Sequence, residues 1–210
     1  MMGYQHLLLF GSVMGAACFL VIYFWPRILL FVYKRAILVK GFGKGPVPVN
    51  TLYVEPQSVF ADPLRAAPAS GSNLMTTGVN RDTLATVGWL DLRKGPQVLH
   101  VPNMAGRYYS VQLTDPSNNA NFGYVGKRTT GTEAGGYLIG GPGWTGSVPP
   151  GMTRIASPGN SVRALGRTLV VSDADLSAAY ALSNQIQSDA ARRLTSLRTD
   201  LRGRAHRLSV

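Results

Sequence analysis

The feature that most constrains this chain is a run of 19 residues without a charged side chain, from residue 7 to residue 25. As an α-helix rising about 1.5 Å per residue, the run would be about 28 Å long, close to the roughly 30 Å of a bilayer core. A cleavable signal peptide should begin with basic residues and end in small ones. Here no Lys or Arg precedes the run, and it ends in Tyr23, Phe24 and Trp25. We therefore expect an uncleaved membrane anchor.

The charges of the chain indicate how this anchor is oriented. The sequence holds 21 Lys and Arg residues against 10 Asp and Glu residues, a net charge of +11, and residues 27–44 contain five cations and no acid. The cations are not gathered in one patch, so nucleic acid is not expected as a partner, whereas a bilayer with an anionic inner leaflet is. Lys and Arg beside a span stay on the cytoplasmic side. We expect a single-pass protein of the cell membrane with its N-terminus outside and its C-terminal domain cytoplasmic; the alternative places the domain on the outer face. The cations that determine this topology are Arg27, Lys34, Arg35, Lys40 and Lys44.

The residues after the run are too few and too charged to cross the bilayer again. We expect residues 28–39 to continue along the membrane interface, with Tyr33 at the level of the lipid headgroups. Pro26 can kink the helix there, because it removes one backbone donor. The anchor with this continuation is assigned to residues 1–40.

Within the run, small residues recur at a spacing of four: Gly11 with Gly15, and Ser12 with Ala16. This spacing lets the backbone of a second membrane helix approach closely, and so predicts packing against other integral-membrane subunits. Gly is also simply common in membrane helices. Both interpretations stay open.

The rest of the chain divides by composition into three parts. Residues 41–73 are rich in Gly, Pro, Ala and Ser, which is typical of an extended linker, although apolar residues such as Leu52 and Phe60 suggest that parts of it dock. Residues 74–171 show short β-prone runs separated by turns, the pattern of an all-β sandwich or barrel. We expect residues 107–113 to form a strand with Tyr109 on its buried face, and to pair with residues 97–101 in a hairpin.

Residues 172–210 form the last part. Ser172 followed by Asp175 resembles a helix start, and an Ala-rich segment without Pro or Gly then runs to about residue 201. We expect a C-terminal helix with an Arg-rich tail that lies on the membrane surface or on a partner; a solvated tail is the alternative. The contact residues would be Arg192, Arg193, Arg198 and Arg202.

Several motifs between residues 78 and 187 resemble the bacterial domain of unknown function 1254 family. They include Asn-Arg-Asp-Thr at residues 80–83, Trp-Leu-Asp-Leu at 89–92, Gly-Arg-Tyr-Tyr at 106–109 and Gly-Pro-Gly-Trp at 141–144. The resemblance implies a β-sandwich related to jelly rolls, and no established catalytic residues come with it. The expected fold class is therefore mainly β: one N-terminal transmembrane helix, a jelly-roll-like β-sandwich and a C-terminal α-helix.

No catalytic or metal-ligand set is legible, and no cofactor is expected. The three histidines are scattered along the chain, and the single cysteine, Cys18, lies in the apolar run. The pattern Gly-x-Ser-x-Gly of a nucleophile elbow does not occur. A speculative pocket would combine Asp82, His100 and Arg167.

These observations favour a non-catalytic accessory subunit that packs on and stabilises a larger membrane protein complex. An integral-membrane oxidoreductase such as a hydrocarbon monooxygenase is one possible partner. The alternative is a membrane-anchored enzyme or small-molecule-binding protein with a pocket in the sandwich. A third interpretation makes the Arg-rich tail a tether to lipid or nucleic acid.

Overall fold

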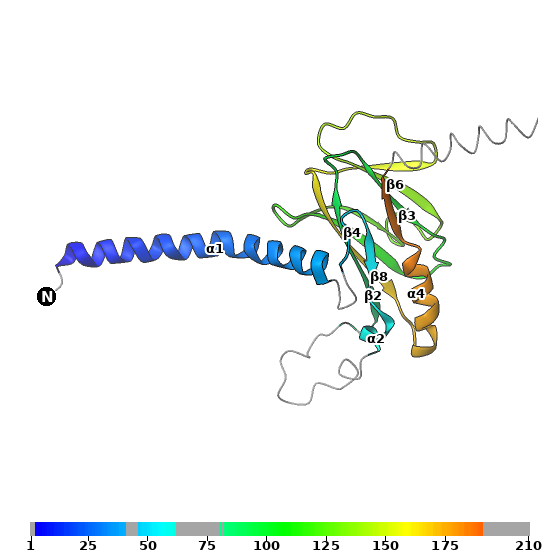
Figure 1. The fold of residues 1–210 in the computed structure, drawn as a ribbon, viewed down its shortest axis with the longest axis horizontal. Helices are drawn as coiled ribbons and strands as arrows, with labels where there is room; N and C mark the ends of the chain where they lie inside the picture. The colour runs from blue at the N-terminus through cyan, green and yellow to red at the C-terminus, as the bar shows by residue number, and fades with distance from the viewer. Residues whose placement is uncertain (1–2, 41–45, 62–79, 81, 191–210) are drawn as a thin grey trace, which may run out of the picture.

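The computed structural model describes residues 3–40, 46–61, 80 and 82–190 (Figure 1). The first element is the helix α1, Tyr4–Lys40, which has 37 residues and contains Pro26. At about 1.5 Å per residue it is about 55 Å long, much longer than a bilayer core requires. Most of α1 projects away from the β-rich part of the molecule, and its C-terminal end lies against that part (Figure 1).

Two sheets make up the β-rich part. Sheet A has the strand order β1-β2-β8-β4-β5, and sheet B has the order β7-β6-β3-β9. All neighbouring strands are antiparallel except β6 and β7, which run parallel. The strands of sheet A are β1 Leu52–Val54, β2 Thr83–Asp91, β4 Tyr109–Asp115, β5 Ala120–Gly126 and β8 Ser161–Leu169. Those of sheet B are β3 Gln97–Val101, β6 Gly135–Gly140, β7 Met152–Ala156 and β9 Gln187–Ala190.

The main hydrophobic core lies between the two sheets. Alternation along β8 shows how it forms: Val162 and Ala164 are buried in the core, whereas the residues between them are half-buried. Tyr109 and Leu113 of β4 are fully buried on the same core face, as their spacing predicts. The fold class expected from the sequence is confirmed: a mainly β molecule with a long apolar helix before the sheets and a short helix near the end.

The prediction that residues 97–101 and 107–113 form a hairpin is wrong. Strand β3 pairs with β6 and β9 in sheet B, whereas β4 pairs with β5 and β8 in sheet A. The connection between them holds Met104, which is fully buried in the core and whose N–H donates to the Thr132 carbonyl at 2.7 Å. Because Met104 is anchored in the core, the chain crosses from one sheet to the other and does not turn back beside β3.

The C-terminal helix is much shorter than the Ala-rich segment predicts. A 3-10 turn, η1 Asp173–Asp175, leads into α4 Leu176–Asn184, and the chain then forms β9. The cause is Ile186, which is buried in the main core directly before β9. Residues 191–210 lie outside the described part of the chain, and with them the four arginines expected to contact membrane or partner.

The start of that turn is held by a long-range ion pair and not by the expected cap. Ser172 makes no side-chain cap hydrogen bond. Instead, Arg107 donates to both carboxylate oxygens of Asp175, at 2.5 and 2.6 Å, and to the Leu169 carbonyl at 2.8 Å. The Val171 N–H also donates to Asp175 at 2.9 Å. The hydrogen bonds from Arg107 and Val171 lower the pKa of Asp175 to about 2.

The segment expected to be a linker docks where the sequence suggested. Strand β1 pairs with β2, and Leu52 packs against the main core. A short helix, α2 Gln57–Phe60, places Phe60 against a small cluster with Leu84 and Ala179. The described half of this segment therefore belongs to the sandwich.

Candidate functional site at the junction of helix and sandwich

Helix α1 has two parts with different surroundings. Residues 4–29 are all exposed, as Trp25 illustrates with 56% of its surface accessible. From Leu30 onward, residues on one face become buried or half-buried: Leu30, Lys34, Ile37 and Leu38. These four residues are spaced by 4, 3 and 1, which is one stripe of an α-helix. We call residues 30–38 the docked part of α1.

The surface that receives this stripe is the outer face of sheet A. Val87 and Trp89 of β2 point away from the main core and form a separate buried cluster with Ile37 and with Val47 from the chain that follows the helix. Leu165 of the neighbouring strand β8 packs against the same cluster. Strand β2 is therefore buried on both faces, in agreement with the unbroken burial of residues 84–90.

Trp89 is the centre of the junction. It is 1% exposed, and the ring of Tyr33 meets it edge-on with centroids 6.0 Å apart. The Lys34 ammonium lies 5.8 Å from the ring centroid, within the range of a cation–π interaction. Tyr33 therefore contacts the sandwich on one side while 42% of its surface stays exposed.

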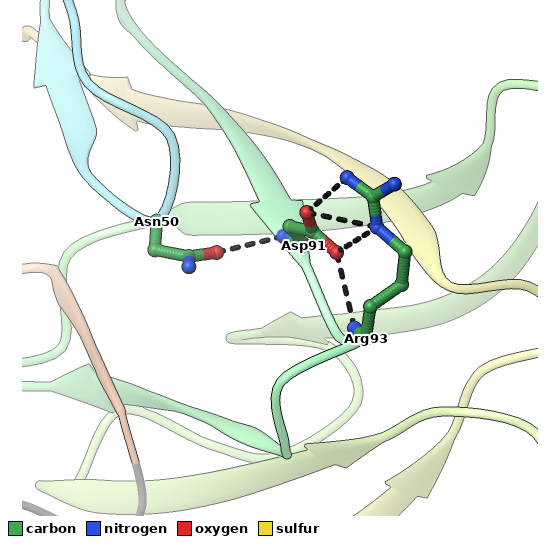
Figure 2. Close-up of polar contacts among 3 residues, drawn as sticks. All are labelled: Asn50, Asp91 and Arg93. Carbon is green, nitrogen blue, oxygen red and sulfur yellow. Dashed lines mark hydrogen bonds and ion pairs between the residues drawn. The ribbon is translucent and has the colours of Figure 1, made fainter.

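Beside this cluster, hydrogen bonds attach the segment that follows α1 to strand β2. Asn50 has a left-handed backbone, with φ of 67°, and its N–H donates to the Trp89 carbonyl at 2.7 Å. Its side-chain oxygen accepts the Asp91 N–H at 2.7 Å, as Figure 2 shows. Asp91 in turn accepts hydrogen bonds from the Arg93 guanidinium, the shortest at 2.5 Å. The bond from Arg93 is the main cause that lowers the pKa of Asp91 to about 2, and the charge of Lys34 acts in the same direction.

Two adjoining clefts flank the docked helix. The larger has a volume of about 510 Å³ and a mixed lining, in which the charged and amide side chains are Lys34, Asp91, Arg93, Asp115 and Asn160. The smaller, of about 220 Å³, lies nearer the projecting part of α1 and is lined by residues of the helix, of β2 and of the loop after β4. Both share Lys34, Pro116, Ser117 and Ser161. The lining of the smaller cleft is completed by Arg27, Leu30, Phe31 and Trp89.

A family model described as "Protein of unknown function (DUF1254)" matches residues 63–190. The chain belongs to this family. The DUF1254 chain is also similar to the crystal structure of the VPA0106 protein from Vibrio parahaemolyticus, with 22% identity and a TM-score of 0.60. That similarity covers 83% of this chain and 38% of the other, so the DUF1254 chain spans well under half the length of that protein. No curated protein matches the chain.

The structure does not bring the three residues of the speculative pocket together. Arg167 lies in β8, opposite Ala85 in sheet A, and its neighbour Thr168 is fully buried on the core side. His100 lies in β3 of sheet B between two core residues, Leu99 and Val101. Arg167 and His100 therefore face outward from opposite sheets. Asp82 is exposed just before β2.

The cations expected to set the topology have distinct positions. Arg27 donates to the Tyr23 carbonyl at 2.7 Å and lies 4.0 Å from the Tyr23 ring centroid, so its side chain points back toward the apolar part of α1. Lys34 is half-buried and Arg35 is exposed. The side chain of Lys40 and the whole of Lys44 lie outside the described residues.

The small residues of α1 all lie in its exposed part. A side chain added at Gly11 or at Gly15 would meet nothing within 4 Å. Ser12 and Ala16 are exposed beside them. Within the described chain, this face of the helix is thus uncovered. No group of three or more His, Cys, Asp or Glu side chains suited to a metal ion occurs among the described residues.

Sequence analysis missed the junction itself, although its signals are in the sequence. Trp89 and Leu90 are adjacent large apolar residues in one strand, so one of them must face away from the sandwich core. The apolar stripe from Leu30 to Leu38 begins where the uniformly apolar run ends. Taken together, these two patterns point to a helix packed on the outer face of the sheet.

Proposed function

We propose that this DUF1254 chain is a single-pass membrane accessory subunit, which packs on a larger integral-membrane complex and holds a sandwich domain at a fixed place on the membrane surface. The observation that carries the proposal is the continuity of α1. One unbroken helix joins an exposed apolar segment to a stripe buried against Trp89. A domain held only by a flexible linker would need no such packing.

The exposed part of α1 fits a membrane span. The stretch Tyr4–Val39 is the one described helix long and apolar enough to cross a bilayer, with a mean hydropathy of 2.3 in its most apolar window and none of that window buried. Lipid would cover the apolar side chains that the sandwich leaves uncovered. The proposed orientation puts Arg27, Lys34 and Arg35 with the sandwich on the cytoplasmic side.

The partner contact is proposed for the face that carries Gly11 and Gly15. Small residues let another helix come close enough to gain backbone contacts, and this face meets nothing else in the described chain. The described junction consists of apolar packing around Trp89 and hydrogen bonds to Asp91, which supports a structural role. Fold alone would license no more.

Purification of the full chain from its native membrane in mild detergent tests the partner contact. We expect an integral-membrane protein to co-purify in a fixed ratio, and the double variant Gly11→Leu/Gly15→Leu to lose it. Nothing in the described chain obstructs a side chain at either position, so the variant should still fold. Ala17→Leu is the matched control, because residue 17 lies on the opposite side of the helix. A lone monomer, or equal loss in variant and control, would refute the partner contact.

Labelling with a membrane-impermeant thiol reagent in intact cells tests the orientation. Cys18 is the single cysteine of the chain, so a Cys18→Ser background is free of other thiols. Tyr4 and Val171 are each 75% exposed and lie at opposite ends of the molecule, which makes Tyr4→Cys and Val171→Cys suitable probes. We expect labelling at position 4 only. Labelling at position 171 only would place the domain on the outer face and overturn the proposed orientation.

A further inference from the structure

The two clefts beside the docked helix form an amphipathic site at the level where α1 leaves its apolar run. The smaller cleft combines apolar Leu30, Phe31 and Trp89 with two cations, Arg27 and Lys34. The larger cleft, farther along the helix, adds the charged side chains of Asp91, Arg93 and Asp115 to a mixed lining. Such an order, with an apolar part toward the span and a polar part away from it, matches the order of groups in a membrane lipid.

Helix geometry places this site at the membrane surface. Measured along the axis from Trp25, Arg27 lies about 3 Å and Lys34 about 13 Å farther on. The polar layer of a bilayer leaflet is about 5–8 Å thick. Arg27 and Leu30 therefore lie within the headgroup layer when residues 7–25 span the core, and Lys34 lies just above it.

The charges around the clefts define what fits there. Among the described residues the two linings contain three cations, Arg27, Lys34 and Arg93, and two carboxylates, Asp91 and Asp115. Asp91 and Arg93 already pair with each other. The net charge of the two linings is therefore +1, which a single phosphodiester would neutralise.

The larger cleft also contains uncharged hydrogen-bonding side chains. They are the hydroxyls of Ser117 and Ser161 and the amide of Asn160, and the same lining holds the buried carboxylate of Asp115. Hydroxyls and carboxylates bind the hydroxyl groups of a polyol well. They offer no aromatic cage for a quaternary ammonium group.

We propose that the cleft beside the docked part of α1 binds one anionic phospholipid with a hydroxylated headgroup, of the phosphatidylglycerol or phosphatidylinositol type. Its phosphate lies between Arg27 and Lys34, its headgroup hydroxyls enter the cleft toward Asp115 and Asn160, and its chains run along Leu30 and Phe31 into the bilayer. The site rests on the proposed membrane insertion of α1 but needs no protein partner. The lipid would bridge helix and sandwich at the point where they meet.

Native mass spectrometry of the purified full chain in detergent tests the site. The chain is titrated separately with phosphatidylglycerol, with phosphatidylcholine of the same acyl chains, and with sn-glycerol 3-phosphate. We expect saturable binding of one phosphatidylglycerol and weaker binding of the other two ligands. Equal binding of the two lipids would refute recognition of the headgroup. Competition by glycerol phosphate at the same concentration as the lipid would show that the site takes a water-soluble ligand, and would refute the lipid assignment.

Two matched variants identify the site. Lys34→Gln should weaken phosphatidylglycerol binding about tenfold, the effect of losing one hydrogen bond to a charged group. Arg35→Gln removes the same charge from the next, exposed residue and should leave binding unchanged. Equal loss in both would indicate general surface attraction and overturn the proposal.

A third variant covers the case in which Lys34→Gln disturbs the fold. Ser117→Trp fills the cleft from an exposed position and removes no charge, and the hydrogen bond from its N–H to Asp115 comes from the backbone. It should abolish the preference for phosphatidylglycerol while the circular dichroism spectrum stays unchanged; a retained preference would refute the site. The assay contains no second protein, so its failure would leave the accessory role standing. Failure of co-purification would likewise leave lipid binding intact.

Discussion

The two parts of α1 are equally helical and both rich in apolar residues, yet they meet different surroundings. Ile22, in the projecting part, is 74% exposed, whereas Ile37, in the docked part, is 3% exposed. What separates them is pattern. The projecting part is apolar on every side, which suits lipid, whereas the docked part buries one stripe against sheet A and leaves Phe31 and Val32 exposed. Apolar content alone therefore does not decide which part packs on the sandwich.

Pro26 lies four residues before the docked part of α1 begins. Proline inside a helix removes one hydrogen bond and its ring crowds the preceding turn. In this helix the Arg27 guanidinium donates to the Tyr23 carbonyl, in the turn that Pro26 disturbs. The helix thus continues past the proline, and the orientation of the projecting part is tied to that of the sandwich.

The largest difference between the two parts of α1 is expected when Trp89, the centre of the junction, is removed. Trp89→Ala should lower the free energy of unfolding by about 3–5 kcal/mol, because a large buried side chain is lost from between helix and sheet. Trp25→Ala, in the projecting part, should change it by less than about 0.5 kcal/mol in detergent. Guanidinium chloride unfolding of the full chain, followed by near-ultraviolet circular dichroism, measures both. Similar losses for the two tryptophans would show that α1 is not docked.

Substitution of two isoleucines of α1, one docked and one projecting, tests the same contact with changes in the helix. Ile37→Ala should cost about 2–3 kcal/mol, since its side chain is buried against Val87 and Trp89. Ile22→Ala removes the same atoms from an exposed position and should cost little. In protease digestion, the Ile37 variant should also be cut sooner between helix and sandwich than the Ile22 variant. Equal resistance would contradict a docked helix.

Acid should weaken an ion pair in the sandwich, through Asp175, and one beside the junction, through Asp91. The pKa of Asp175 is about 2 in the folded chain against a usual 3.8, with the Arg107 hydrogen bonds as the main cause. Because the folded value is the lower one, the stabilisation is complete above about pH 4 and is lost as the pH falls toward 2. Asp175→Asn should cost about 1–2 kcal/mol at pH 7, between the values for exposed and buried pairs, and should flatten the pH dependence between 4 and 2.

The matched control for this acid effect is Asp173→Asn, which alters an exposed carboxylate in the same turn. Its pH profile should follow that of the unaltered chain. The pKa of Asp91 is also about 2, so some acid sensitivity should remain in the Asp175 variant. A variant profile as steep as that of the unaltered chain would rule out the Arg107 pair as a source of acid sensitivity.

Local patterns predicted much of this fold. The uncharged run, the alternation in β4 and the turns between the strands each lie within a few residues of sequence, and the structure has the corresponding elements. Errors arose where a distant contact decided the outcome. Burial of Met104 redirected the chain after β3, and burial of Ile186 ended α4 early. An isolated apolar residue in a polar or Ala-rich segment was the available signal in both cases.

The candidate site was harder to predict for the same reason. Asn50, Lys34 and Asp91 come from three separate segments, and they come together only because the docked part of α1 lies on β2. Asp82, His100 and Arg167 were chosen by chemical type, which carries no information on the face of the sheet to which each belongs. Strand parity alone would have separated His100, which lies between the core residues Leu99 and Val101, from a site outside sheet A.

The smallest expected effect is that of Lys34, which lies half-buried at the edge of the junction. Lys34 and Arg35 are adjacent cations, but only Lys34 lies over the Trp89 ring, at 5.8 Å. In lipid-free detergent, Lys34→Ala should lower the free energy of unfolding by about 0.5–1 kcal/mol, the range of a partly exposed cation–π contact. Arg35→Ala should stay within about 0.5 kcal/mol of zero. Repeating the Lys34 measurement in a Trp89→Phe background should shrink its cost, because the weaker ring attracts the ammonium less. An undiminished cost would mean that Lys34 does not act through the Trp89 ring, and would refute the cation–π contact.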